Sequence, residues 1–157
     1  MRMGGIAVAI QPDLRLYGRD GHLVLIVDVR ARYGTTPEWA AKLRQNLFET
    51  GEFPAAEFFL VATPEHMYLW KGVGKDPSLI PPTHVFDARS VLKPYSESAG
   101  LDEPPVHKEV FDMVINFWLS ELASWRELSA EDEQSWVKDS GLLAAIKNGR
   151  IELPDAA

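Results

Sequence analysis

Apolar and polar residues alternate in two neighbouring segments near the N-terminus, residues 13–18 and 22–32. This two-residue period predicts a pair of β-strands. The second segment is apolar at almost every position before Asp28, which is typical of a strand buried on both faces. Asp20-Gly21 lies between the segments and favours a two-residue hairpin turn. In the register that this turn sets, Asp13 lies opposite Asp28.

After this hairpin the apolar spacing changes to that of a helix. The helix is predicted to begin after Thr36, a good N-cap, with Pro37 at its first position and Gly51 at its end. One side of it carries the apolar stripe that would pack on the sheet, formed by Trp39, Ala40, Leu43 and Leu47. Two further strands are predicted over residues 58–62 and 67–70.

The second half of the chain is less regular. Residues 72–105 are rich in glycine and proline, and they predict a loop-rich connection with one short strand at 83–86. Residues 106–125 predict a helix that is apolar over more than one narrow stripe, so it is buried on two sides or forms an oligomer interface. Smaller elements are predicted as a strand at 6–10, a helix around Trp136 that begins with a capping box at 129–132, a short helix at 142–146 and an edge strand at 151–153.

These elements predict an α/β fold with a mixed central β-sheet flanked by helices, in a single domain over residues 1–157. The chain has no cysteine, so thiol catalysis, disulfides and cysteine-based zinc sites are excluded. It shows neither a signal peptide nor an apolar run long enough for a membrane span, and we expect a cytoplasmic protein with no membrane partner.

The net charge is −7, which argues against non-specific nucleic-acid binding by the whole surface. The first fifty residues, however, carry a small positive balance. Basic side chains gather around the predicted hairpin, and we interpret Arg15, Lys42 and Arg44 as a phosphate-binding patch. Scattered surface charge is the alternative interpretation.

Asp13 and Asp28 are the candidate site. Like charges directly across two strands are destabilising, and a bound divalent cation would resolve the conflict. Arg30 follows Asp28 by two residues and therefore points to the same face. The alternative is that Asp13 caps a turn, and that Asp28 pairs with Arg30 or Arg15.

Pro12-Asp13 and Asp28-Val29-Arg30 resemble the motif of the PD-(D/E)xK nuclease superfamily. The order of hairpin, helix and strand pair, through Trp70-Lys71, is similar to compact bacterial members, whereas no resemblance extends beyond about residue 75. The resemblance implies a restriction-endonuclease-like fold and a Mg²⁺ or Mn²⁺ site formed by Asp13, Asp28 and the carbonyl of Val29. It also implies hydrolysis of DNA phosphodiester bonds, with Asp13, Asp28 and Arg30 as the catalytic residues.

The chain departs from that motif at Arg30, where the family has lysine. Arginine cannot give up its proton, although it can bind a phosphate through two hydrogen bonds. Three alternatives follow. The enzyme works with a modified site, Lys42 supplies the amine, or the domain is a non-catalytic binding or assembly module that retains the fold.

The segment before Pro12 is also too short for the strand and acidic helix with which many members begin. We expect the 106–125 helix to fill that layer, to form a homodimer interface, or both. Glu109 or Glu121 on this helix is a candidate for the missing acid, and a solvated helix face is the alternative interpretation of both.

Overall fold

The structure is a computed structural model that describes residues 11–99, 106–124 and 135–153. Its centre is a six-stranded sheet in the order β5-β4-β3-β2-β1-β6. Strands β2 and β3 are parallel, and all other neighbours are antiparallel. The predicted α/β architecture with a mixed central sheet is therefore confirmed. The strands are β1 (Leu14–Tyr17), β2 (Leu23–Val29), β3 (Phe58–Ala62), β4 (His66–Lys71), β5 (His84–Asp87) and β6 (Arg150–Glu152).

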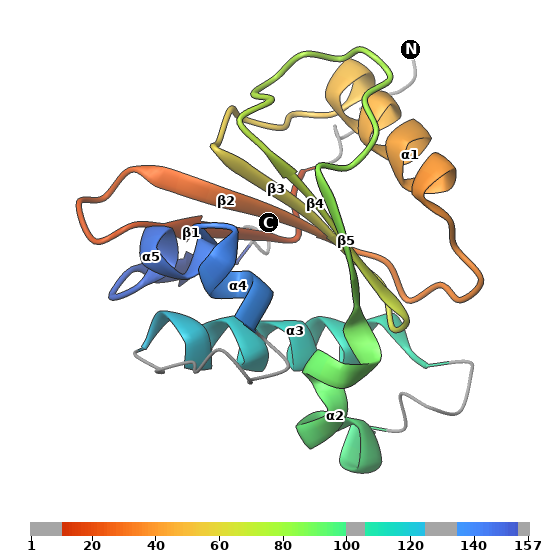
Figure 1. The fold of residues 1–157 in the computed structure, drawn as a ribbon, viewed down its shortest axis with the longest axis vertical. Helices are drawn as coiled ribbons and strands as arrows, with labels where there is room; N and C mark the ends of the chain where they lie inside the picture. The colour runs from red at the N-terminus through yellow and green to blue at the C-terminus, as the bar shows by residue number, and fades with distance from the viewer. Residues whose placement is uncertain (1–10, 100–105, 125–134, 154–157) are drawn as a thin grey trace, which may run out of the picture.

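Helices cover both faces of this sheet (Figure 1). The helix α1 (Pro37–Thr50) connects β2 to β3 and packs on one face, where Ala40 and Leu47 are buried. The other face carries α2 (Ala88–Ala99), α3 (Lys108–Ala123) and α5 (Leu142–Ile146), and α4 (Ser135–Asp139) leads into α5. As predicted, α1 begins after Thr36, whose side chain accepts a hydrogen bond from the Trp39 N–H.

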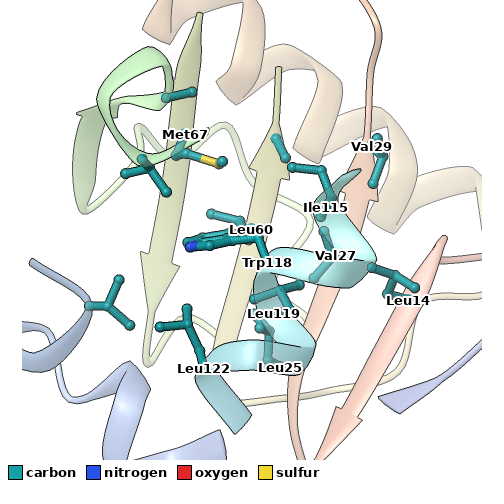
Figure 2. Close-up of a cluster of buried hydrophobic side chains, with 14 of the residues drawn as sticks. Leu14, Leu25, Val27, Val29, Leu60, Met67, Ile115, Trp118, Leu119 and Leu122 are labelled. Carbon is teal, nitrogen blue, oxygen red and sulfur yellow. The ribbon is translucent and has the colours of Figure 1, made fainter. Parts of the chain in front are cut away.

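The larger part of the core lies between the sheet and α3. Figure 2 shows α3 crossing the strands, with Ile115, Trp118, Leu119 and Leu122 above the side chains of β2 and β3. Leu25, Val27 and Val29 face this cluster, whereas Ile26 belongs to the core on the α1 side. Because side chains alternate along a strand, Asp28 points to the α1 side. The prediction that β2 is buried on both faces is confirmed, since its last five residues are all buried.

The predicted hairpin forms, but its turn is longer than expected. The Gly21 N–H donates to the Gly18 carbonyl, and the Gly18 N–H donates to the His22 carbonyl. The two-residue turn prediction was therefore wrong. A register shift at Tyr17 compensates for the longer turn, so that Leu14 still lies opposite Val27. The register predicted near Asp13 and Asp28 is retained although the turn differs.

The helix α2 was not predicted, because its segment contains Pro94 and lies among other prolines and glycines. It starts directly after β5, where the Arg89 N–H donates to the Asp87 side chain. Ala88, Val91 and Leu92 are buried at helical spacing and anchor it under the sheet. Burial of this apolar face stabilises the helix by more than is lost because Pro94 has no backbone N–H to donate. The strand predicted at 6–10 and the capping box at 129–132 lie outside the described residues.

The helix α3 packs on one face of the sheet, which it shares with α2 and α5. That it takes the place of the first helix of the nuclease family stays a prediction. Its outer side still exposes two large apolar residues, Met113 at 49% and Phe117 at 53%. Whether a second copy covers them stays a prediction. None of the helices in the described part of the chain combines the length and hydrophobicity that a bilayer crossing requires.

Candidate functional site

Asp28 lies next to the last residue of β2, at the sheet edge where the parallel strands β2 and β3 end together. In open α/β sheets ligands bind outside the carboxyl ends of such strands. The Asp28 side chain is almost fully buried and holds a close ion pair with Arg30, at 2.6 Å from Nε to Oδ2. Arg30 Nη2 lies 3.5 Å from the second oxygen, Oδ1. The predicted proximity of Arg30 to Asp28 is thus present.

Burial raises the pKa of Asp28 to about 6. The hydrogen bond and positive charge of Arg30 act in the opposite direction. The negative charge of Asp13 raises the pKa further, although less than burial does. The main cost of ionising Asp28 is therefore the loss of water around it, and repulsion between the two carboxylates is secondary.

Asp13 precedes the first residue of β1 and still bonds to both peptide groups beside Asp28. Its N–H donates to the Val27 carbonyl at 2.9 Å, and its Oδ2 accepts from the Val29 N–H at 2.7 Å. These two bonds bring Asp13 to the end of β2 that carries Asp28. Because Asp13 lies outside the paired register, its position on the same face as Asp28 stays a prediction.

Lys108 and Asp112, the first and fifth residues of α3, complete the site. Lys108 Nζ lies 3.0 Å from Asp13 Oδ1 and 3.0 Å from Asp112 Oδ1. Burial alone would lower the pKa of Lys108, but its hydrogen bonds to Asp112 and Asp13 outweigh this effect and raise it. Burial raises the pKa of Asp112, against the opposing charge of Lys108. Lys108 therefore holds its proton and links α3 to the end of β1.

Sequence reasoning missed both Lys108 and Asp112. They lie in the half of the chain for which no resemblance was found, and Lys108 is 95 positions from Asp13. The one available signal was their i, i+4 spacing at the start of a helix, which is common on solvated surfaces. The predicted acids on α3 lie elsewhere: Glu109 is exposed, and Glu121 accepts a hydrogen bond from Tyr95.

The three predicted phosphate-binding residues, Arg15, Lys42 and Arg44, differ in exposure and in the groups they contact. Arg15 on β1 is partly buried, and its Nη1 lies 3.8 Å from Oε1 of Glu152. Lys42 is exposed on α1.

Arg44 is fully buried, and its guanidinium donates to the carbonyls of Gly74 and Asp76, which holds the loop after β4. Its assignment to a phosphate-binding patch is therefore corrected. A buried guanidinium that already donates to backbone carbonyls cannot reach a phosphate.

The charged groups at this sheet edge suit a hard divalent cation by their chemistry. Carboxylate and carbonyl oxygens are the ligands that Mg²⁺ and Mn²⁺ prefer. Asp13, Asp28 and the carbonyl of Val29 supply them near the end of β2, and an ion there would replace Lys108 or Arg30 on a carboxylate. Within the described ranges, no three His, Cys, Asp or Glu side chains form a group that could hold a metal. The carbonyl and water would complete the coordination.

A pocket of about 390 Å³ opens beside the carboxylates (this space is called the α3 pocket below). Asp13 and Asp112 contribute its acidic side. The other lining residues are Leu14, Met113, Asn116 and Leu153. The charged cluster therefore borders a space large enough for part of a small ligand.

Comparisons of the chain with protein-family models, with curated proteins and with solved structures found no match.

Proposed function

We propose that this protein is a metal-dependent nuclease with a restriction-endonuclease-like fold that hydrolyses DNA phosphodiester bonds. The observation that carries the proposal is the pair of hydrogen bonds between Asp13 and the peptide groups on either side of Asp28, one donated by the Asp13 N–H and one accepted by its carboxylate. They bring two carboxylates to one end of a hairpin that is followed by a helix and a parallel strand. This order of elements and residues is the one that the resemblance to PD-(D/E)xK nucleases implies.

Each residue of the site would have a separate role. Asp13, Asp28 and the Val29 carbonyl hold Mg²⁺ or Mn²⁺, which supplies an activated water and neutralises charge on the phosphate when bound. Arg30 binds a phosphate oxygen. Lys108 stays protonated, because its pKa is raised. It therefore stabilises developing negative charge and is not the base that removes a proton from water.

The test is cleavage of plasmid and linear DNA with Mg²⁺ or Mn²⁺. We expect Asp28→Ala to abolish cleavage together with the rise in melting temperature that the metal causes. Arg30→Lys should preserve or increase the rate, since it restores the family residue. Lys108→Met should lower the rate far more than Lys138→Met, which changes an exposed lysine on α4 in the same way. Equal cleavage rates in the two lysine variants would show that Lys108 takes no part in catalysis.

The second candidate is a non-catalytic binding or assembly module that keeps the fold. It is favoured by the partners that the carboxylates already have. Arg30 is paired with Asp28, while Lys108 and the Val29 N–H bond to Asp13. This candidate predicts that neither DNA nor RNA is cleaved with either metal, and that Asp28→Ala raises stability because it removes a buried charge. That pair of results would replace the nuclease proposal.

We further propose that the protein acts in the cytoplasm and that Phe117 contributes to a homodimer contact on α3. The side chain is 53% exposed in the middle of a helix whose opposite side is buried against the sheet. Exposed apolar side chains of this size often mark an interaction surface.

A further inference from the structure

We propose that the α3 pocket binds one unpaired nucleobase of the substrate, so that the enzyme acts on single-stranded DNA or on an unpaired end. The inference rests on the proposed function, because it treats Asp13 as a metal ligand next to the scissile phosphate. It extends that function by naming the form of the DNA and the residues that select it.

The α3 pocket has the size and the lining that a single base requires. Its volume of about 390 Å³ lies at the lower end of the range for small-ligand sites, which suits a group as small as one nucleoside. Leu14, Met113 and Leu153 give it apolar walls, and Met113 and Leu153 are about half exposed. Enzymes that take a base out of the stack hold it between such apolar surfaces.

The same pocket also has a polar edge. Asn116 Oδ1 accepts a hydrogen bond from the Ser120 hydroxyl at 3.2 Å, so the nitrogen is the donor end of that amide. The Asp112 carboxylate is an acceptor on the same helix. A donor and an acceptor on one wall match a base that carries an exocyclic amine beside a ring nitrogen or carbonyl. Cytosine, adenine and guanine each carry such an amine, whereas thymine carries none.

The α3 pocket lies next to the candidate metal site. Asp13 belongs both to the α3 pocket and to the candidate metal site. A phosphate held at the metal site would therefore place a neighbouring nucleotide at the entrance of the pocket. A base inside a duplex is stacked and paired, so only an unpaired base can enter.

The charge of the site depends on whether a cation is bound. Lys108 and Arg30 compensate only part of the negative charge of Asp13, Asp28 and Asp112. Glu109 also acts on Asp112, so the site is acidic by itself, and a divalent cation would offset this charge. DNA binding at this site should consequently require the cation, whereas a general basic surface would bind DNA without it.

The experiment measures binding apart from cleavage. Fluorescence anisotropy with labelled twelve-nucleotide probes is recorded in Ca²⁺ and in EDTA, and probe integrity is checked on gels. The probes are oligo-dC, oligo-dT, an abasic strand of the same length and a duplex. The variants are Met113→Glu and Asn116→Ala in the pocket. Val85→Glu is the matched control, since Val85 is 43% exposed on β5 at the far edge of the sheet.

We expect the wild type in Ca²⁺ to bind oligo-dC more tightly than oligo-dT, the abasic strand or the duplex. Met113→Glu should weaken oligo-dC binding by at least about tenfold, the effect of losing one stacked base. Asn116→Ala should remove the preference for oligo-dC over oligo-dT. Binding of the abasic strand should be the same in all variants, and Val85→Glu should behave as wild type.

The outcomes separate this inference from the proposed function. Cleavage that depends on Asp28, together with oligo-dC binding that Met113→Glu leaves unchanged, would overturn the base pocket and keep the nuclease. Loss of oligo-dC binding in Met113→Glu, with wild type unable to cleave, would keep the base pocket as a binding site and overturn the nuclease. Wild type that binds duplex as tightly as oligo-dC would also overturn the inference.

Discussion

Asp28 is the residue whose environment makes the sharpest prediction. Burial raises its pKa to about 6, so the folded protein binds a proton there more tightly than the unfolded chain does. Its contribution to stability is therefore present at low pH and is lost as the pH rises toward and through 6. Asp28→Asn stays neutral at every pH. We expect the variant to gain about 2 kcal/mol of unfolding free energy over wild type between pH 4 and pH 7.5.

Urea unfolding of both proteins at the two pH values measures this change. Other groups, such as Asp112, titrate equally in both proteins and cancel in the difference. A gap between the two proteins that is the same at both pH values would mean that Arg30 fully compensates the buried charge.

Arg44 and Lys42 were grouped by sequence as phosphate-binding residues, and the structure separates them. Arg44→Met leaves the carbonyls of Gly74 and Asp76 without their buried donor. We expect it to cost about 3 kcal/mol of unfolding free energy. Lys42→Met changes an exposed side chain on the same helix and should cost less than about 0.5 kcal/mol. Chemical denaturation measures both values, and similar costs would contradict the structural role of Arg44.

At the scale of elements, β6 is held against β1 by a close approach that only glycine permits. A side chain at Gly149 would collide with the Tyr17 carbonyl oxygen, which belongs to the backbone of β1 and cannot turn away. Gly149→Ala should therefore lower the unfolding free energy by about 3 kcal/mol and expose the β6 amides to hydrogen exchange. Gly21→Ala is the comparison, because Gly21 has a φ of 87° and open space around it.

Gly21→Ala should cost only the strain of a left-handed residue, about 1 kcal/mol. A larger loss for Gly21→Ala than for Gly149→Ala would show that the hairpin turn matters more than the attachment of β6.

The elements that sequence predicted well are those with a strong local pattern. The hairpin strands, α1, the pair β3 and β4, and α3 each carry an apolar period or a cap that is visible within a few residues. The helix α2 lacked such a signal, because Pro94 and its neighbours favour a loop until the buried face is taken into account. The register near Asp13 was predicted correctly from a wrong turn, since a register shift at Tyr17 offsets the longer loop.

The site was predictable only where its residues belong to one local motif. Asp13, Asp28 and Arg30 could be grouped because a hairpin brings them together. Lys108 could not, because it lies 95 positions from Asp13, on a helix that follows β5 and α2 along the chain. The burial of Arg44 depends on the carbonyls of a loop whose path no sequence pattern defines.

At the scale of the whole molecule, the outer side of α3 has two potential occupants. The α3 pocket needs Met113 accessible to a base, whereas a homodimer through the centre of the helix would cover Met113 together with Phe117. The two residues are one helical turn apart and half exposed. A dimer and a bound strand are therefore compatible only if the dimer contact is confined to the Phe117 side.

Light scattering with and without oligo-dC in Ca²⁺ tests this point. We expect the protein alone to dimerise with increasing concentration, because burying Phe117 removes apolar surface from water. Phe117→Asp should shift the protein to monomer, while Leu79→Asp, which changes an equally exposed residue in the loop after β4, should not. If the dimer covers Met113, oligo-dC must dissociate it by mass action. A wild type that stays monomeric at every concentration would disprove the dimer and leave the pocket open.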